Sequence, residues 1–309
     1  MTPLRLGTRK SRMATTQSGQ IADRLTELTG RAVELVGVTT FGDVSKAHLT
    51  QLGGTGVFVS ALRDRLIDGE IDFAVHSLKD LPTAQDPRVT IAALPTRDDP
   101  RDALVGSTKL ADLPSGARVG TGSQRRVAQL RALRPDLEYV AIRGNADTRI
   151  GKVIAGELDG VVLALAGLTR LGRADEIAQI FEVDELLPAP GQGALAVECR
   201  VDRADLADLL AVLDDQRTRA AVSAERAVLA ALDAGCAAPV GAFAVCERDP
   251  HRPGVDTVRM TAVAMAIDGV RSVRKSIAGP SEAATNLGRD LAAEMIAEGA
   301  GTLIGEQKH

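Results

Sequence analysis

The sequence has few of the residues on which several classes of protein depend. Aromatic residues make up only 2% of its 309 residues, with no tryptophan and a single tyrosine. Little is therefore available for stacking on the bases of a single-stranded nucleic acid. The formal net charge is −4, which provides no overall basic field. We expect no nucleic acid partner.

Cysteine and histidine are also sparse. Three cysteines without CxxC spacing do not form a disulfide framework or a zinc site. The four histidines are scattered without metal-ligand spacing, so no metal is expected. Cys199 and Cys246 lie in apolar stretches, and we interpret both as core residues.

Long apolar runs are missing as well. No run approaches the about 20 residues that a membrane-spanning helix needs, and the first residues lack the apolar core of a signal peptide. We expect a cytoplasmic protein with no membrane partner. The composition, 45% hydrophobic and 25% charged, is typical of globular domains. The length favours two domains, or three small ones.

The stretch from Ile71 to Pro82 combines a short apolar strand with a polar end. Phe73 to Val75 suit a buried strand, and Pro82 blocks regular continuation. Ligands of open α/β sheets bind outside the carboxyl ends of strands, which is where His76, Ser77, Lys79 and Asp80 would stand. For an isolated strand end, a capped corner with solvated charges is the simpler interpretation. Arginines at other strand ends favour a binding site.

Two arginines occupy an unfavourable place in a predicted helix. Arg125 and Arg126 fall in the first turn of a helix from residue 124 to about 133, with Ser123 as its N-cap. Arg149 stands likewise in the first turn of the next helix. Cations at the positive end of a helix dipole cost roughly 0.3–1 kcal/mol each. A local cost without a local gain suggests an external anion, although solvated surface arginines remain an alternative.

Two breaks in the α/β pattern divide the chain. Residues 95–102 and 186–193 interrupt it with proline, glycine and charge, as two crossings between the same regions would. We expect two α/β lobes with parallel sheets, joined by paired hinges with a cleft between them, and a small α+β domain with three antiparallel strands. The predicted domains are residues 1–95 with 194–215, residues 100–189, and residues 217–309.

Several motifs in order resemble those of one enzyme family, the hydroxymethylbilane synthases or porphobilinogen deaminases. Each motif alone is weak, but their order and spacing over nearly the whole chain are specific. The motifs are Thr8-Arg9-x-Ser11, Gly42-Asp43, His76-Ser77-x-Lys79-Asp80-x-Pro82, Asp99-Pro100-Arg101-Asp102, Gly120-Thr121-x-Ser123-x-Arg125-Arg126, Arg143-Gly144-Asn145, Ala166-Gly167-Leu168-x-Arg170-Leu171-Gly172, Pro190-Gly191-Gln192-Gly193 and Gly235-Cys236-x-x-Pro239-x-Gly241.

The resemblance implies a fold, an activity and a cofactor. The family has two lobes like those of type II periplasmic binding proteins plus a small cysteine-bearing domain. Its members are transferases of porphyrin (tetrapyrrole) biosynthesis. They join four porphobilinogen molecules head to tail, release ammonia at each addition, and free linear hydroxymethylbilane by hydrolysis. The chain grows on a dipyrromethane cofactor, held by a thioether that would here involve Cys236. Monomers are the expectation.

The resemblance also implies roles for individual residues. Asp80 would stabilise the cation left when ammonia departs and would transfer protons, and Lys79 would orient Asp80 or carboxylates. Arginine suits the acetate and propionate groups of the pyrroles. The implied cofactor-binding residues are Cys236, Arg9, Ser11, Ser77, Lys79, Asp80, Thr121, Ser123, Arg125, Arg126, Arg143 and Gly144. The implied substrate-binding residues are Arg9, Phe58, Arg143, Arg149, Arg170 and Gln192.

One departure and two alternatives accompany the resemblance. Gln51 and Thr55 stand in a glycine-rich loop where family members often carry lysine, so that loop would not grip the cofactor through charge. A two-lobed anion-binding module without catalysis would share the lobes but gives no use for Cys236. A phosphate-binding transferase would need a phosphate loop or clustered metal ligands, and the sequence has neither.

Overall fold

The computed structural model describes residues 2–38, 56–235, 237–248 and 254–305, with the side chains of residues 56–58 left aside. Residue contacts divide the chain into two compact units. The first unit contains residues 1–97 and 194–219, and the second contains residues 98–193 and 220–309. The chain therefore passes between the units three times.

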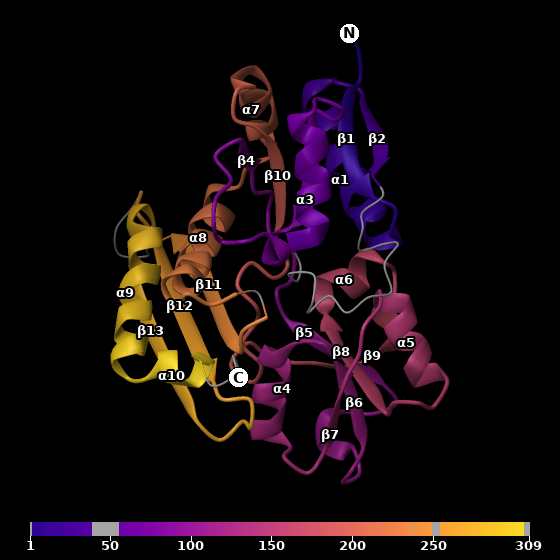
Figure 1. The fold of residues 1–309 in the computed structure, drawn as a ribbon, viewed down its shortest axis with the longest axis vertical. Coiled ribbons are helices and arrows are strands. Elements are labelled where there is room, and N and C mark those ends of the chain that lie inside the picture. Colours follow the sequence, from indigo (N-terminus) through magenta and orange to yellow (C-terminus); the bar gives the residue numbers. More distant parts are fainter. Residues whose placement is uncertain (1, 39–55, 236, 249–253, 306–309) are drawn as a thin grey trace. The chain divides into compact units, whose positions relative to one another are not determined.

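The first unit is built on a five-stranded mixed sheet with the order β2-β1-β3-β10-β4 (Figure 1). Strand β1 is parallel to β2 and β3, whereas β10 is antiparallel to both of its neighbours, β3 and β4. The strands are β1 (Leu4–Arg9), β2 (Val33–Val38), β3 (Phe73–Ser77), β4 (Val89–Ala93) and β10 (Leu195–Arg200).

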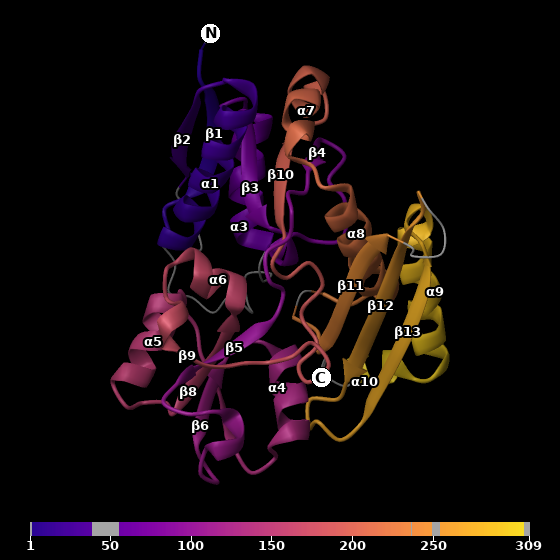
Figure 2. The ribbon, with the colours of Figure 1, turned by 180° about the vertical axis from the view of Figure 1, so that it is seen from behind.

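Helices cover both faces of this sheet (Figure 1, Figure 2). The alternation of side chains along β3 sends Phe73 and Val75 into a core with Ile21 and Leu25 of α1. Ala74 faces the other way and packs with α3. The helices of the unit are α1 (Arg12–Thr29), α3 (Gly56–Ile67) and α7 (Ala204–Leu210), with 3-10 turns η1 (Leu78–Asp80) and η4 (Ala211–Leu213).

The second unit contains a sheet with the corresponding order, β7-β6-β8-β5-β9. Strand β6 is parallel to β7 and β8, and β5 is antiparallel to β8 and β9. The strands are β5 (Asp102–Gly106), β6 (Arg118–Thr121), β7 (Glu138–Ala141), β8 (Gly160–Ala164) and β9 (Ile177–Ile180). Around them lie α4 (Gln124–Leu133), α5 (Ala146–Ile154), α6 (Leu165–Arg170), η2 (Leu110–Asp112) and η3 (Ala174–Glu176).

A three-stranded antiparallel sheet, β11-β12-β13, completes the second unit (Figure 2). One apolar core joins this sheet to α8, α9 and α10. The β12–β13 turn contacts α4, because Arg131 Nη1 donates to the Ile267 carbonyl at 2.8 Å. The elements are α8 (Gln216–Ala231), β11 (Val240–Arg248), β12 (Asp256–Met265), β13 (Ser272–Pro280), η5 (Ser281–Ala283), α9 (Ala284–Ala297) and α10 (Ala300–Gly305).

This topology confirms the predicted fold class of two lobes of the type II periplasmic-binding-protein kind plus a small α+β domain. The prediction of wholly parallel sheets is wrong for β5 and β10, because each first strand after a crossing runs opposite to its neighbours. The predicted connector, residues 95–102, overlaps β5 at the first residue of the strand, Asp102. The apolar run of residues 160–166 suits a strand throughout, but β8 ends at Ala164 and helix α6 begins at Leu165.

Candidate active site

The turn after β3 presents Asp80 to solvent. Leu78 and Leu81 are buried, with 0% and 1% of their surface exposed, while Asp80 between them is exposed and Lys79 is half-buried. The Leu78 N–H donates to the carbonyl of Ala194 at 3.0 Å, which ties the turn to the start of β10. Two apolar anchors and one backbone bond therefore fix this short turn with its carboxylate outward.

Ser77, the last residue of β3, contacts a side chain that the sequence did not single out. Its Oγ lies 3.2 Å from Nε2 and 3.3 Å from Oε1 of Gln17, a buried residue of α1. Gln17 therefore restricts the Ser77 hydroxyl. Nearby in the chain, Arg9 is half-buried at the end of β1, and Ser11 Oγ caps α1 by accepting from the Ala14 N–H.

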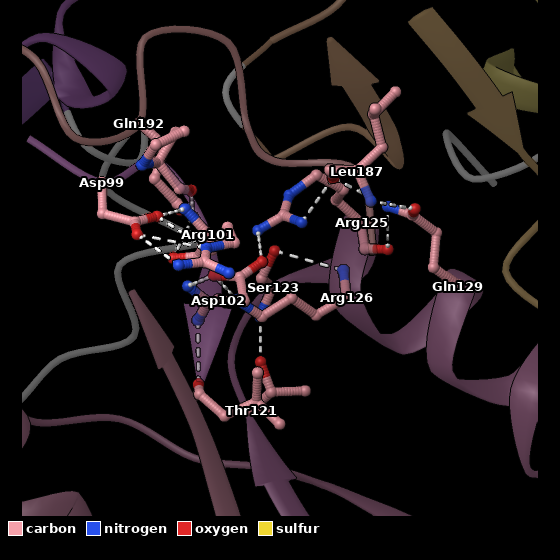
Figure 3. Close-up of polar contacts among 12 residues, drawn as sticks. Asp99, Arg101, Asp102, Thr121, Ser123, Arg125, Arg126, Gln129, Leu187 and Gln192 are labelled. Atoms are coloured by element: carbon pink, nitrogen blue, oxygen red, sulfur yellow. Dashed lines mark hydrogen bonds and ion pairs between the residues drawn. The ribbon is translucent and has the colours of Figure 1, made fainter. Parts of the chain in front are cut away.

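In the second unit, one buried carboxylate holds the two arginines in the first turn of α4 (Figure 3). Asp102 has 0% of its surface exposed. Its Oδ2 accepts from Arg125 Nη2 at 2.8 Å, and its Oδ1 accepts from Arg126 Nη2 at 2.7 Å. Gln192 Nε2 donates to Oδ1 at 2.8 Å. The anion that the two arginines were predicted to need is thus supplied, in part, by the chain itself.

Backbone carbonyls receive further donors of this cluster. Arg125 Nη1 donates to the Leu187 carbonyl at 2.7 Å, and Arg126 Nη1 donates to the Val162 carbonyl at 2.9 Å. Arg125 Nε is buried and has no acceptor among the described residues. Two guanidinium cations against one carboxylate leave one positive charge in excess. The cluster therefore still favours a nearby anion.

Burial and the neighbouring charges shift the pKa of the Asp102 carboxyl in opposite directions. Burial alone would raise the pKa of the Asp102 carboxyl, but the charges and hydrogen bonds of Arg125 and Arg126 outweigh it, so the pKa lies below its ordinary value. Burial lowers the pKa of Arg125. Asp102 is therefore an anion throughout the neutral range.

Thr121 and Ser123 shape the start of α4. Ser123 Oγ lies 3.5 Å from the Arg126 N–H in the N-cap position, and the Ser123 N–H donates to Thr121 Oγ1 at 3.2 Å (Figure 3). Thr121 is buried and Ser123 half-buried. The predicted cap is confirmed.

The next strand end exposes an arginine. Arg143 and Gly144 are exposed after β7, and Arg149 Nε donates to the Gly144 carbonyl at 2.9 Å. Gly144 has a φ of 108°, and a Cβ there would lie 2.9 Å from the Thr148 Cβ. Glycine is thus required at this corner.

Two residues predicted to bind substrate have partners within the chain. Arg170 lies at the end of α6, where its Nε donates to Asp98 Oδ2 and its Nη2 to the Gly193 carbonyl, both at 2.8 Å. Gln192 has 0% of its surface exposed, and its amide also donates to the Pro100 carbonyl at 2.7 Å. Both side chains therefore connect the two crossing segments, and their predicted role toward substrate stays a prediction.

Comparison of the sequence with known protein families identifies the family of this chain. A family model described as "Porphobilinogen deaminase, dipyromethane cofactor binding domain" matches residues 4–208, and "Porphobilinogen deaminase, C-terminal domain" matches residues 219–297. The chain belongs to the porphobilinogen deaminase family. The resemblance seen in the sequence motifs is therefore confirmed.

Curated relatives match almost end to end. Porphobilinogen deaminase 1 of Streptomyces coelicolor is 58% identical over 98% of this chain and 98% of its own length. Porphobilinogen deaminase of Thermobifida fusca is 58% identical over 99% and 97%, and that of Mycobacterium marinum is 50% identical over 97% and 96%. Among solved structures, the Methionine Binding Protein, MetQ, matches 68% of this chain and 89% of its own with 12% identity and a TM-score of 0.45.

Some residues singled out by the family resemblance lie outside the described part of the chain. Cys236 is one, although its neighbours Gly235 and Ala237 are exposed. Gln51, Thr55 and the side chain of Phe58 are others. Among the described residues, no group of three or more His, Cys, Asp or Glu side chains could hold a metal ion. No helix in those same residues is long and apolar enough to cross a membrane.

Replacing Asp102 with asparagine is expected to destabilise this protein by about 3–5 kcal/mol, because two buried guanidinium groups would lose their counter-ion. The matched control is Asp99→Asn, since the Asp99–Arg101 pair is 35% and 29% exposed and should change stability by less than about 1 kcal/mol. Urea denaturation measures both. Equal, small losses would contradict the importance of the buried cluster.

The Asp102 effect has a defined pH dependence. Its pKa is lowered in the folded protein, so its contribution is complete above the ordinary carboxyl value of 3.8 and is lost as pH falls through the folded value. The difference in stability between wild type and Asp102→Asn should therefore stay nearly constant from pH 5 to pH 8, because pH 5 is already more than one unit above the ordinary carboxyl value of 3.8.

Proposed function

We propose that this protein is a hydroxymethylbilane synthase acting as a cytoplasmic monomer. It joins four porphobilinogen molecules head to tail, releases one ammonia at each addition, and frees linear hydroxymethylbilane by hydrolysis. The observation that carries the proposal is the family match over both residues 4–208 and residues 219–297. The exposed carboxylate of Asp80 on a rigid turn supports it from the structure.

The donor groups suit a dipyrromethane cofactor, whose acetate and propionate groups are carboxylates. The Asp102 cluster has an excess positive charge and a buried Arg125 Nε without an acceptor among the described residues. Arginine guanidinium groups bind carboxylates with paired hydrogen bonds. The residues that would hold the cofactor are Cys236, through a thioether, with Arg9, Ser11, Ser77, Lys79, Asp80, Thr121, Ser123, Arg125, Arg126, Arg143 and Gly144. When bound, the cofactor supplies the pyrrole position to which porphobilinogen is joined.

Asp80 is the proposed catalytic residue. Loss of ammonia from porphobilinogen leaves a cationic methylene-pyrrole, and a fixed carboxylate beside it stabilises the developing charge. Asp80 also takes and returns protons at the pyrrole and the leaving amine. Lys79, half-buried beside it, orients Asp80 or a substrate carboxylate. Exposure of Asp80 and burial of its two leucine neighbours support this arrangement.

The proposed substrate-binding residues are Arg9, Phe58, Arg143, Arg149, Arg170 and Gln192. Arg143 is exposed at a strand end, as a carboxylate-binding group requires. Arg170 and Gln192 are engaged within the chain, so they would act only after exchanging those partners. Arg143→Leu should therefore raise the KM for porphobilinogen more than Gln192→Leu.

The proposal is tested by incubating the purified protein with porphobilinogen. Hydroxymethylbilane and ammonia should form in a ratio of about one to four, because each addition is one substitution of ammonia. Uroporphyrin formed from the product by acid and oxidation gives the optical readout. A protein that binds porphobilinogen without releasing ammonia would instead be a binding module, and the proposal would be wrong.

A further inference from the structure

A buried ionic cluster lies in the first unit, on the side of the sheet that α3 covers. Its centre is Glu198 of β10, with 1% of its surface exposed. Arg63 of α3 donates to it with two groups, Nη2 to Oε1 at 2.7 Å and Nε to Oε2 at 3.1 Å. His76 Nε2 lies 3.3 Å from Oε2. One carboxylate therefore contacts a helix and a neighbouring strand.

Strand register explains why these side chains meet. Ala196 of β10 pairs with His76, and Glu198 pairs with Ala74. Residues two apart share a face of a sheet, so Glu198 and His76 point to the same side. Helix α3 covers that side with Leu62 and Leu66, which pack on Ala74. Arg63 reaches the carboxylate from the same helix.

Stability alone is a poor reason for this arrangement. A buried ion pair contributes little net stability, because removing charges from water opposes their attraction. Burial would raise the pKa of the Glu198 carboxyl, but contacts with His76 and Arg63 outweigh it and hold the pKa below its ordinary value. Glu198 is thus a buried anion stabilised by both neighbours. Such a buried polar network is suited to fixing the relative positions of the elements that it joins.

The cluster lies beside the proposed catalytic turn. His76 directly precedes Ser77, and Asp80 follows within the next turn. Strand β10 also holds this turn through the pairing of Leu195 with Ser77 and the Ala194–Leu78 backbone bond. The 3.3 Å approach of His76 Nε2 to Glu198 Oε2 adds a side-chain contact between β3 and β10.

We propose that Glu198 is a positioning residue for the reaction at Asp80. By holding Arg63 and His76 at once, it fixes α3 and the end of β3 against β10 and so sets the place of the catalytic turn. This inference rests on the proposed function, because it assumes that Asp80 reacts with porphobilinogen. A displacement of a catalytic group by about 1 Å is enough to slow a reaction by about a hundredfold.

The test compares Glu198→Gln with Asp72→Asn. Asp72 pairs with Arg5 at 3.0 Å and is 15% exposed. It lies immediately before the first residue of β3, whereas His76 lies near the last, so Asp72 provides a partly buried ion pair away from the catalytic turn. Glu198→Gln should lower kcat about tenfold or more and change KM less than about threefold. Asp72→Asn should leave kcat unchanged. Equal kcat values for Glu198→Gln and wild type would overturn the inference.

A double-mutant cycle supplies a second measurement. Because His76 is proposed to act through Glu198, adding His76→Asn to Glu198→Gln should lower kcat no further. Multiplied effects of the two changes would contradict the shared role. If Glu198→Gln does not fold, the single variant His76→Asn tests the proposal. A lowered kcat with little change in KM supports the positioning role, and a wild-type kcat overturns it.

Failure of the inference and failure of the proposed function look different. If the wild-type protein releases no ammonia from porphobilinogen, the proposed function itself is wrong. A wild-type protein that is active, loses turnover in Asp80→Asn and keeps it in Glu198→Gln removes only the positioning role.

Discussion

Replacing Asp80 with asparagine is expected to lower turnover by about a hundredfold or more, since a positioned acid–base group contributes about 10²–10⁴ in rate. Asparagine has the same shape but carries neither charge nor an exchangeable acidic proton. The fold should be unaffected, because Asp80 is exposed and the turn is anchored by Leu78 and Leu81. The initial rate of ammonia release measures the effect.

The matched control for this change is Asp68→Asn. Asp68 is another exposed carboxylate of the first unit, in the turn after α3, and its replacement should leave the rate unchanged. Intact mass must show the same cofactor content in wild type and both variants. Near-normal turnover of a purified, cofactor-loaded Asp80→Asn protein would contradict the assigned role of Asp80.

Replacing Cys236 with serine is expected to abolish activity completely, because no thioether to the primer can form. The wild-type protein should exceed its sequence mass by one dipyrromethane, and Cys236→Ser should have the sequence mass of the variant alone. Electrospray mass spectrometry of intact protein measures both. An Ehrlich-type colour reaction, positive only for wild type, reports the dipyrrole independently.

Two other thiols must be excluded as attachment points. Cys199 is buried, and burial raises its pKa to about 11, so its reactive thiolate is scarce near neutral pH. Cys246 on β11 is half-buried and packs against the apolar core of the three-stranded sheet, which agrees with its interpretation as a core residue. Cys246→Ser should therefore keep the added mass. A Cys236→Ser protein that still carries it would refute the assignment.

Local sequence signals predicted much of the fold. Ser11 and Gly30 are residue types that commonly end helices, and the structure has Ser11 as the N-cap of α1 and Gly30, with a φ of 67°, as its C-cap. Ser123 was recognisable as the cap of α4. Such signals act over four residues or fewer, so the sequence contains them directly.

Long-range partners were not accessible in the same way. Asp102 is 23 and 24 residues from the two arginines that it binds, and local patterns say nothing about such pairs. A usable signal was nevertheless present: Asp102 and Glu198 are each a lone carboxylate in an apolar strand. Since an unpaired buried charge is costly, each predicts a buried cation, although not which one.

The antiparallel direction of β5 and β10 was missed for a related reason. Hydrophobic patterns describe burial but not strand direction. Direction follows from where the chain re-enters a sheet after its crossing, which depends on contacts between distant segments. For Cys236 and Asp80, likewise, the sequence motifs indicated the protein family but not the distance between the two residues, which are far apart in the chain.

Strand β10 has a consequence for biosynthesis on the ribosome. Within its sheet, β4 pairs only with β10, yet 101 residues separate Ala93 from Leu195 in the sequence (195 − 93 − 1). The sheet of the first lobe therefore stays incomplete, with an unpaired strand edge, until the whole second lobe has emerged from the exit tunnel. Nascent chains halted near residue 190 should be held by chaperones or cut by proteases, whereas chains extended past β10 should become resistant.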